Sequence, residues 1–131
     1  MSFRKEVKYR LSKSEMQNLK SNLSFLGMTS IFQPRTINSV YFDSRDQQMF
    51  FDSEEGILPR KKLRVRYYDN RDTTFCKETK FSTLEGRFKT TSALGNLKNF
   101  NCIKKLRWVD NQYGLLKPVI AIKYRRQYFQ F

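Results

Sequence analysis

The sequence predicts an α+β domain in which an antiparallel β-sheet curves into a barrel or half-barrel with flanking helices. Two observations carry this prediction. Strand-like and helical segments follow the order β-α-β-β-β-β-α-β, with short polar turns that are typical of hairpins. In three strand-like segments, Arg4–Tyr9, Lys61–Tyr67 and Phe75–Lys80, charged side chains lie two residues apart. A period of two places such side chains on one face of a strand.

The first predicted elements are a strand and a helix. Residues 2–10 predict the strand, and Leu11–Gly27 predicts the helix. Ser12 with Glu15 fits a capping box at the start of the helix, and Gly27 is a typical stop. Apolar residues at helical spacing form a stripe that we expect to pack into the core. These residues are Met16, Leu19, Leu23 and Leu26.

The remaining segments predict most of the sheet. Residues rich in β-branched and aromatic side chains indicate strands at Thr36–Asp43, Lys61–Tyr68, Thr73–Phe81, Arg87–Thr91 and Pro118–Tyr128. The polar turn at residues 69–72 favours a hairpin between the second and third of these. Met49, Phe50 and Phe51 predict a short helix or turn that packs on the sheet. Residues 92–114 carry apolar side chains at mostly helical spacing, which favours one or two short helices.

Composition limits the function. The 131 residues predict a single domain over residues 1–131. A formal charge of +14 favours an anionic partner, such as nucleic acid, phosphates or an anionic membrane surface. The absence of histidine excludes His-based triads and most zinc sites. Two cysteines are too few for a disulfide framework, and no signal peptide or membrane span is recognisable. We therefore expect a reducing, cytoplasmic location or a place in a larger assembly, without membrane insertion.

Six short strings follow one another along nearly the whole chain. They are Arg4–Tyr9, Ser39–Ser44, Lys62–Tyr68, Lys77–Lys80, Arg87–Lys89 and Ile122–Tyr128. In this order they resemble the VTC domain, the polyphosphate polymerase module of vacuolar transporter chaperone proteins and their bacterial relatives. The resemblance implies the fold of the triphosphate tunnel enzymes. In that fold an antiparallel barrel has a lumen lined with Arg, Lys and Glu, which holds triphosphate or polyphosphate with a divalent metal.

The resemblance also implies a set of site residues. The motif positions that bind phosphate in the family fall on Lys8, Arg64, Arg66, Lys80, Lys89 and Arg126. An arginine presents a planar fork that can bind phosphate oxygens bidentately, and two arginines two residues apart can clamp neighbouring phosphates. The alternative interpretation is a solvated, charged strand face. Glu6 and Glu78 are candidate ligands of Mg²⁺ or Mn²⁺, or alternatively ion-pair partners of the cations.

The sequence departs from the family pattern near its end. In the family, the Y-x-R strand is followed by an R-I-T/S-x-D strand and later by an E-x-K strand that closes the barrel, whereas this sequence ends at Phe131. The resemblance therefore implies a C-terminally shortened domain with the basic half of the site. We expect another protein chain, or a second copy, to cover the open sheet edge.

Three classes of function remain open. The first is binding of inorganic polyphosphate or a nucleoside triphosphate by a domain that is catalytically weak or inactive alone, with an active metal-dependent polymerase or triphosphatase as its catalytic alternative. The second is a non-catalytic assembly component, for example of a virion, that retains the fold. The third is nucleic-acid binding, because aromatic residues interleave with basic ones near Tyr67 and Tyr124, although packing is the usual role of aromatics in strands.

Overall fold

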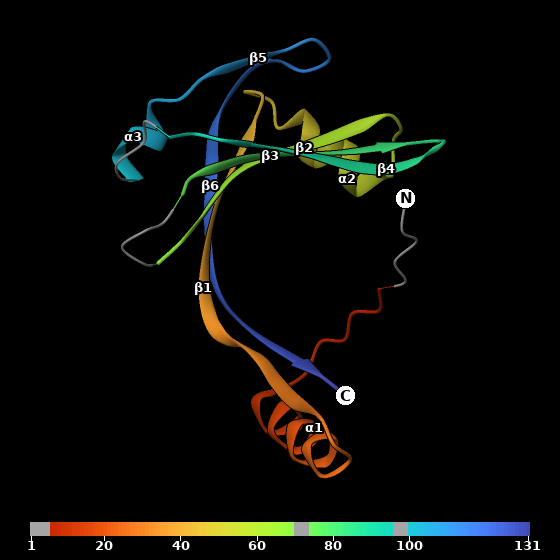
Figure 1. The fold of residues 1–131 in the computed structure, drawn as a ribbon. Helices are drawn as coiled ribbons and strands as arrows, with labels where there is room; N and C mark the ends of the chain where they lie inside the picture. The colour runs from red at the N-terminus through yellow and green to blue at the C-terminus, as the bar shows by residue number, and fades with distance from the viewer. Residues whose placement is uncertain (1–5, 70–73, 96–99) are drawn as a thin grey trace. The chain divides into compact units, whose positions relative to one another are not determined.

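The computed structural model describes residues 6–69, 74–95 and 100–131. Their elements in chain order are α1 (Lys13–Phe25), β1 (Thr29–Asp43), α2 (Gln48–Glu55), β2 (Arg60–Tyr68), β3 (Cys76–Thr83), β4 (Gly86–Ala93), α3 (Phe100–Lys104), β5 (Trp108–Asp110) and β6 (Gly114–Gln130), as Figure 1 shows. The chain forms two compact units. The first comprises residues up to Pro34 together with Gln127–Phe131, and the second comprises Arg35–Arg126.

The strands form one sheet in the order β4-β3-β2-β1-β6-β5. Four strand pairs are antiparallel, namely β1 with β2, β2 with β3, β3 with β4, and β5 with β6. Within the second unit the sheet is curled like part of a barrel (Figure 1). The predicted fold class, an α+β domain with an incomplete antiparallel barrel, is therefore confirmed.

Side-chain alternation gives this sheet one apolar and one charged face. Val40 and Phe42 of β1, with Leu63 and Val65 of β2, are buried in the core. Further core residues are Met49, Phe75, Ile103 and Leu116. The ring of Trp108 in β5 lies 4.7 Å from that of Phe42. Because α3 and β5 contribute to this core, they pack on the apolar face, and the intervening residues of β1 and β2 point to the opposite face.

Helix α2 is held at the end of β1 by Asp43. The Asp43 carboxylate accepts hydrogen bonds from the backbone N–H groups of Met49, at 2.9 Å, and Phe50, at 3.0 Å. These are amide groups of the first helical turn, which have no partner within the helix. Met49 enters the core from this position. The short helix predicted around Met49–Phe51 is therefore confirmed and extends to Glu55.

Two predictions about the N-terminal region are wrong. Residues 6–10 form neither helix nor strand, and residues 1–5 of the predicted strand lie outside the described residues. Helix α1 has the predicted capping box, with hydrogen bonds in both directions between Ser12 and Glu15. None of its residues is buried, however, and Met16 and Leu19 are 43% and 45% exposed. Helical spacing fixes which residues share a face but does not supply elements that cover that face.

The other boundaries differ in detail. Strand β1 begins at Thr29, well before the predicted Thr36. The prediction missed the first residues because they precede Pro34, and a proline usually argues against a strand interior. The predicted Lys61–Tyr68 strand corresponds to β2, and the next strand begins at Cys76 in place of Thr73, which lies outside the described residues. Residues 70–72 of the predicted turn also lie outside them. Residues 92–114 hold the short helix α3 and, unpredicted, the short strand β5.

Candidate functional site

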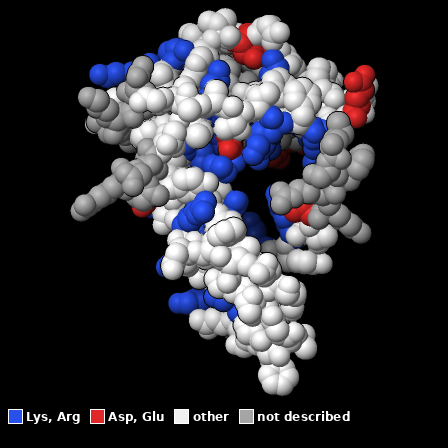
Figure 2. Space-filling model, in the orientation of Figure 1, with Lys and Arg blue, Asp and Glu red and all other residues white. Residues whose placement is uncertain are grey.

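The charged face of the second unit is formed mainly by β2, β3 and β4. In their registers Arg64 lies opposite Glu78, Lys62 opposite Lys80, and Lys80 opposite Lys89. Directly paired residues of an antiparallel sheet point to the same face. We call this group the cationic face; its members are Lys62, Arg64, Arg66, Glu78, Lys80 and Lys89. Figure 2 shows Lys and Arg atoms gathered on the underside of these strands.

A buried carboxylate lies at the centre of the cationic face. Glu78 is only 1% exposed, and its Oε2 accepts a hydrogen bond of 2.7 Å from Nε of Arg64. Nη2 of Arg64 also lies 2.7 Å from Oε2, while Nη2 of Arg66 lies 3.1 Å from Oε1. That second contact is an ion pair without hydrogen-bond alignment, since Oε1 receives no hydrogen bond within the described residues. One carboxylate thus orients two guanidinium groups.

The neighbouring cations keep Glu78 ionised. Burial by itself would raise the pKa of this carboxyl group, because it removes water from the charged form. The hydrogen bond and charge of Arg64 oppose this effect, and the charges of Arg66 and Lys89 add to them. Together they hold the pKa of Glu78 below its ordinary value. The carboxylate therefore serves as the internal counter-charge of the face.

Acid should remove this stabilisation. Because the pKa of Glu78 is lower in the folded chain than its usual 4.5, the ionised carboxylate stabilises the fold above pH 4.5, and the stabilisation is lost as the pH falls through the folded value. We expect the difference in free energy of unfolding between the wild type and Glu78→Gln to be constant above pH 4.5 and to shrink below it. Urea unfolding over a pH series measures it. A difference that persists unchanged in acid would contradict this assignment.

The lysines of the cationic face have little counter-charge: among the described contacts Lys89 reaches Glu78 at 4.0 Å, and that carboxylate is already shared by two arginines. Lys62, Lys80 and Lys89 lie directly opposite one another across three strands, an arrangement of like charges that destabilises a sheet. Although Lys80 is exposed, the surrounding strands remove part of its hydration, and this is the largest cause of its lowered pKa. The charges of Arg64, Lys89 and Lys62 lower the pKa further, against the opposing effect of Glu78.

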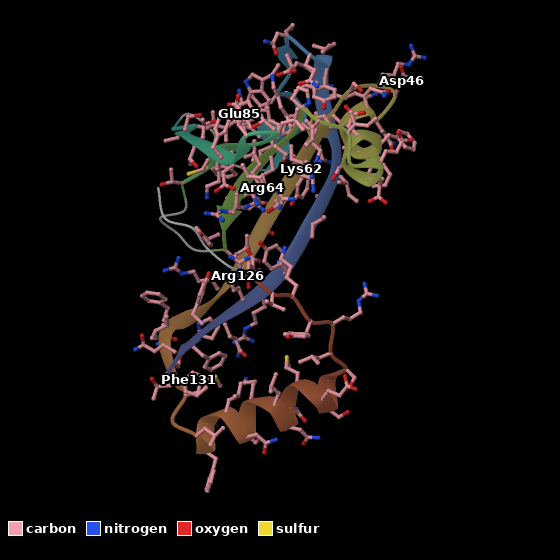
Figure 3. All side chains as sticks on the ribbon, turned by 90° about the vertical axis from the view of Figure 1, so that its right-hand side faces the viewer. Asp46, Lys62, Arg64, Glu85, Arg126 and Phe131 are labelled. Carbon is pink, nitrogen blue, oxygen red and sulfur yellow. The ribbon has the colours of Figure 1, made fainter. Side chains whose placement is uncertain are left out.

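The structure unites four of the six predicted phosphate-binding residues, namely Arg64, Arg66, Lys80 and Lys89. It adds Lys62, whose side chain the period of two had already placed on the same face. Arg126 lies farther along β6, away from Lys62 and Arg64 in Figure 3, and its Nη2 donates to the hydroxyl of Tyr124 at 3.3 Å. Lys8 belongs to the first unit. Its Nζ atom lies 3.6 Å from Oε1 of Glu6, and both side chains are exposed. The phosphate-binding roles of all six residues stay predictions.

Both predicted metal ligands form ion pairs with Lys or Arg side chains. Glu78 is engaged by two arginines, and Glu6 contacts Lys8 in the other unit. Within the described ranges, His, Cys, Asp and Glu residues form no group of three that could hold a metal ion. In the described residues both candidate ligands are thus engaged in ion pairs, and the Mg²⁺ or Mn²⁺ site stays a prediction. Oxygens of a bound phosphate chain would have to supply much of the coordination.

Several aromatic residues near the cationic face are occupied by intramolecular contacts. Tyr67 packs against the core, with its ring centroid 4.7 Å from that of Phe75. The guanidinium groups of Arg66 and Arg35 lie 5.6 Å and 5.3 Å from the ring of Tyr68. These rings serve packing and cation–π contacts, which makes them less available to stack on bases.

Comparison with known proteins gives one match. The family model described as VTC domain matches residues 3–131, a range that contains the whole cationic face. No curated protein and no solved structure gives a significant match. Among the residues that the structure describes, no helix has the length and apolar character needed to cross a membrane.

Proposed function

Because the chain belongs to the VTC domain family, a polyphosphate-related family of the triphosphate tunnel superfamily, we propose that its cationic face binds inorganic polyphosphate or the triphosphate group of a nucleotide. The observation that carries the proposal is the row of Lys62, Lys80 and Lys89, three like charges in direct register. The nearest carboxylate is already shared by two arginines. A polyanion would supply counter-charge for this row, of which only Lys89 reaches Glu78, at 4.0 Å, among the described contacts.

The arginines and lysines would have different roles. Glu78 fixes the positions of the guanidinium groups of Arg64 and Arg66 on the cationic face in the absence of a ligand. Arg66 meets Glu78 through Nη2 alone among the described contacts, so that its other N–H groups can donate to a phosphate. The exposed ammonium groups of Lys80 and Lys89 would act as point charges along the phosphate chain.

Turnover by the isolated chain should be slow or absent. Phosphoryl transfer needs positioning and charge neutralisation more than covalent chemistry, and a divalent metal usually supplies part of the charge. Glu78, the carboxylate of the cationic face, is engaged by arginines, which makes it a poor metal ligand. A phosphate-binding component of a larger assembly accords with this arrangement, and the open edge of β6 considered below also favours an assembly.

Calorimetric titration tests the proposal. We expect saturable binding of polyphosphate and tripolyphosphate that weakens with added salt. Binding should be at least about tenfold tighter than that of single-stranded DNA of equal charge. The three lysines span about 10 Å, two strand spacings, and this suits the directly linked phosphates of polyphosphate better than phosphates separated by sugars.

Two results would change this assignment. Equal affinity for the single-stranded DNA would favour the nucleic-acid binder over the polyphosphate binder. Rapid production of polyphosphate or free phosphate from ATP with Mn²⁺, lost in Lys80→Ala, would show that the isolated chain is an enzyme.

A further inference from the structure

Among the described residues, strand β6 has an open edge along most of its length. The strand runs from Gly114 to Gln130, but β5 pairs only with Gly114–Leu116. Its other neighbour is β1, and no further strand borders it within the described residues. From Lys117 to Arg126, all within the second unit, one side of the strand therefore lacks a strand partner in the described part of the chain. An unpaired edge presents N–H and C=O groups that another strand can bind.

The exposed side chains of this edge are unusually apolar. Val119, Ile120 and Ile122 are 40%, 55% and 42% exposed. Because Val119 and Ile120 are consecutive, apolar groups are exposed on both faces of the strand. Pro118 lies before them and does not remove an N–H group from the stretch that follows. Between Val119 and Ile122 the edge thus lacks the charged residues and prolines by which proteins usually block the addition of a strand.

A cavity adjoins the same residues. It has a volume of about 460 Å³, and Val119, Ile120 and Ile122 form one wall. Met49 and Phe50 of α2 contribute an apolar wall of the same cavity. Polar side chains also line it, namely Tyr41, Asp43, Gln47, Ser53, Glu54 and Lys62. A half-open, mainly apolar cavity of this size can accept a large side chain from a strand that adds to the edge.

The charge of β6 indicates the kind of strand that fits. Residues 114–131 contain no Asp or Glu, and the cations Lys117, Lys123, Arg125 and Arg126 all fall in this strand. The Nζ atom of Lys123 is paired at 3.0 Å with Asp69 from outside the strand, so that an acidic side chain already docks here. A second copy would bring its own charge of +14, which opposes self-association. The complementary partner is acidic.

We propose that residues 117–126 bind an extended acidic segment of another protein, which adds to β6 as a further strand and places an apolar side chain in the cavity beside Ile120. Main-chain hydrogen bonds provide affinity in this mode, while the cavity and the cations select the sequence. The proposal is independent of polyphosphate binding, although Lys62 borders both surfaces.

Synthetic peptides provide the test. The probe alternates Glu and Val, the first control has the same residues in two blocks, and the second control carries N-methyl groups at alternate amides. Fluorescence anisotropy should show the alternating peptide binding at least about tenfold more tightly than either control. Hydrogen exchange should slow at residues 117–126 when it binds. Ile120→Lys should weaken binding about tenfold, and Val109→Lys, at an 82% exposed apolar position of β5, should leave it unchanged.

Other outcomes would overturn the proposal. Equal binding of the block peptide would reduce the interaction to general charge attraction. Slow exchange, in the free monomeric chain, of the amides in this stretch that point away from β1 would show that the edge is already paired. A dimer in light scattering with the same amides protected would assign the edge to a second copy. Lys80→Ala with Lys89→Ala should weaken polyphosphate binding about 100-fold and spare peptide binding, so that failure of either proposal can be distinguished.

Discussion

Glu78→Gln is expected to lower the free energy of unfolding by about 3 to 5 kcal/mol in the absence of an anion and to strengthen polyphosphate binding. Glu78 is almost fully buried and contacts both Arg64 and Arg66. The amide fills the same space but carries no charge, so that two guanidinium groups lose their counter-charge. A loss of this size is typical when one partner of a buried ion pair is removed. Urea unfolding with and without tripolyphosphate measures both effects.

A variant that is less stable but binds polyphosphate more tightly would identify Glu78 as an internal substitute for phosphate. Its carboxylate competes with a bound polyanion for the same cations, so that its removal raises the charge available to the ligand. A ligand that binds only the folded chain stabilises it by mass action, and tripolyphosphate should therefore restore much of the lost stability. If the variant unfolds without ligand, refolding in tripolyphosphate provides the same comparison. Weaker binding by the refolded variant would contradict this role.

Glu85→Gln is the matched control. Glu85 is exposed in the turn between β3 and β4, as Figure 3 shows, and its substitution changes the net charge by the same amount. Surface substitutions of this kind usually change stability by less than about 0.5 kcal/mol. We expect no measurable gain in polyphosphate affinity from this variant. Equal effects of the two substitutions would attribute the result for Glu78 to net charge alone.

Lys80→Gln combined with Lys89→Gln is expected to weaken polyphosphate binding about 100-fold without loss of stability. Each hydrogen bond to a charged group contributes about 1.5 kcal/mol or more, and two such losses correspond to roughly this factor. Stability should be unchanged or higher, because the double variant removes the repulsion within the lysine row. The double variant also loses the contact of Lys89 with Glu78, at 4.0 Å. This loss should lower the stability only slightly, because ion pairs with an exposed partner are worth under about 1 kcal/mol.

Lys13→Gln with Lys105→Gln provides the control of equal charge. Both lysines are exposed and lie outside the cationic face. Calorimetry and thermal unfolding of the two double variants should show a large loss of affinity only for the pair on the cationic face. Equal losses would reduce binding to the overall charge of +14, and a fall in stability of the first variant would show that the lysine row is structural.

The sequence by itself determined the features that depend on local geometry. The period of two assigns Arg64 and Arg66 to one strand face because alternation is a property of any extended backbone. The capping box of Ser12 and Glu15 was likewise predictable, since the residues that form it are three positions apart. The short helix at Met49–Phe51 follows from a local apolar pattern. None of these features requires a distant segment.

Only the tertiary structure decided which strand faces meet and which surfaces stay uncovered. The burial of Glu78 between two arginines depends on the register of β2 with β3, and a shift by one residue would turn its side chain to the other face. The apolar stripe of α1 predicts burial in any sequence, yet no residue of that helix is buried. The resemblance predicted an open sheet edge, but its extent along β6 follows from the structure, in which β5 pairs with only the first three residues of β6. These features depend on contacts between segments far apart in the chain, and local side-chain patterns do not specify such contacts.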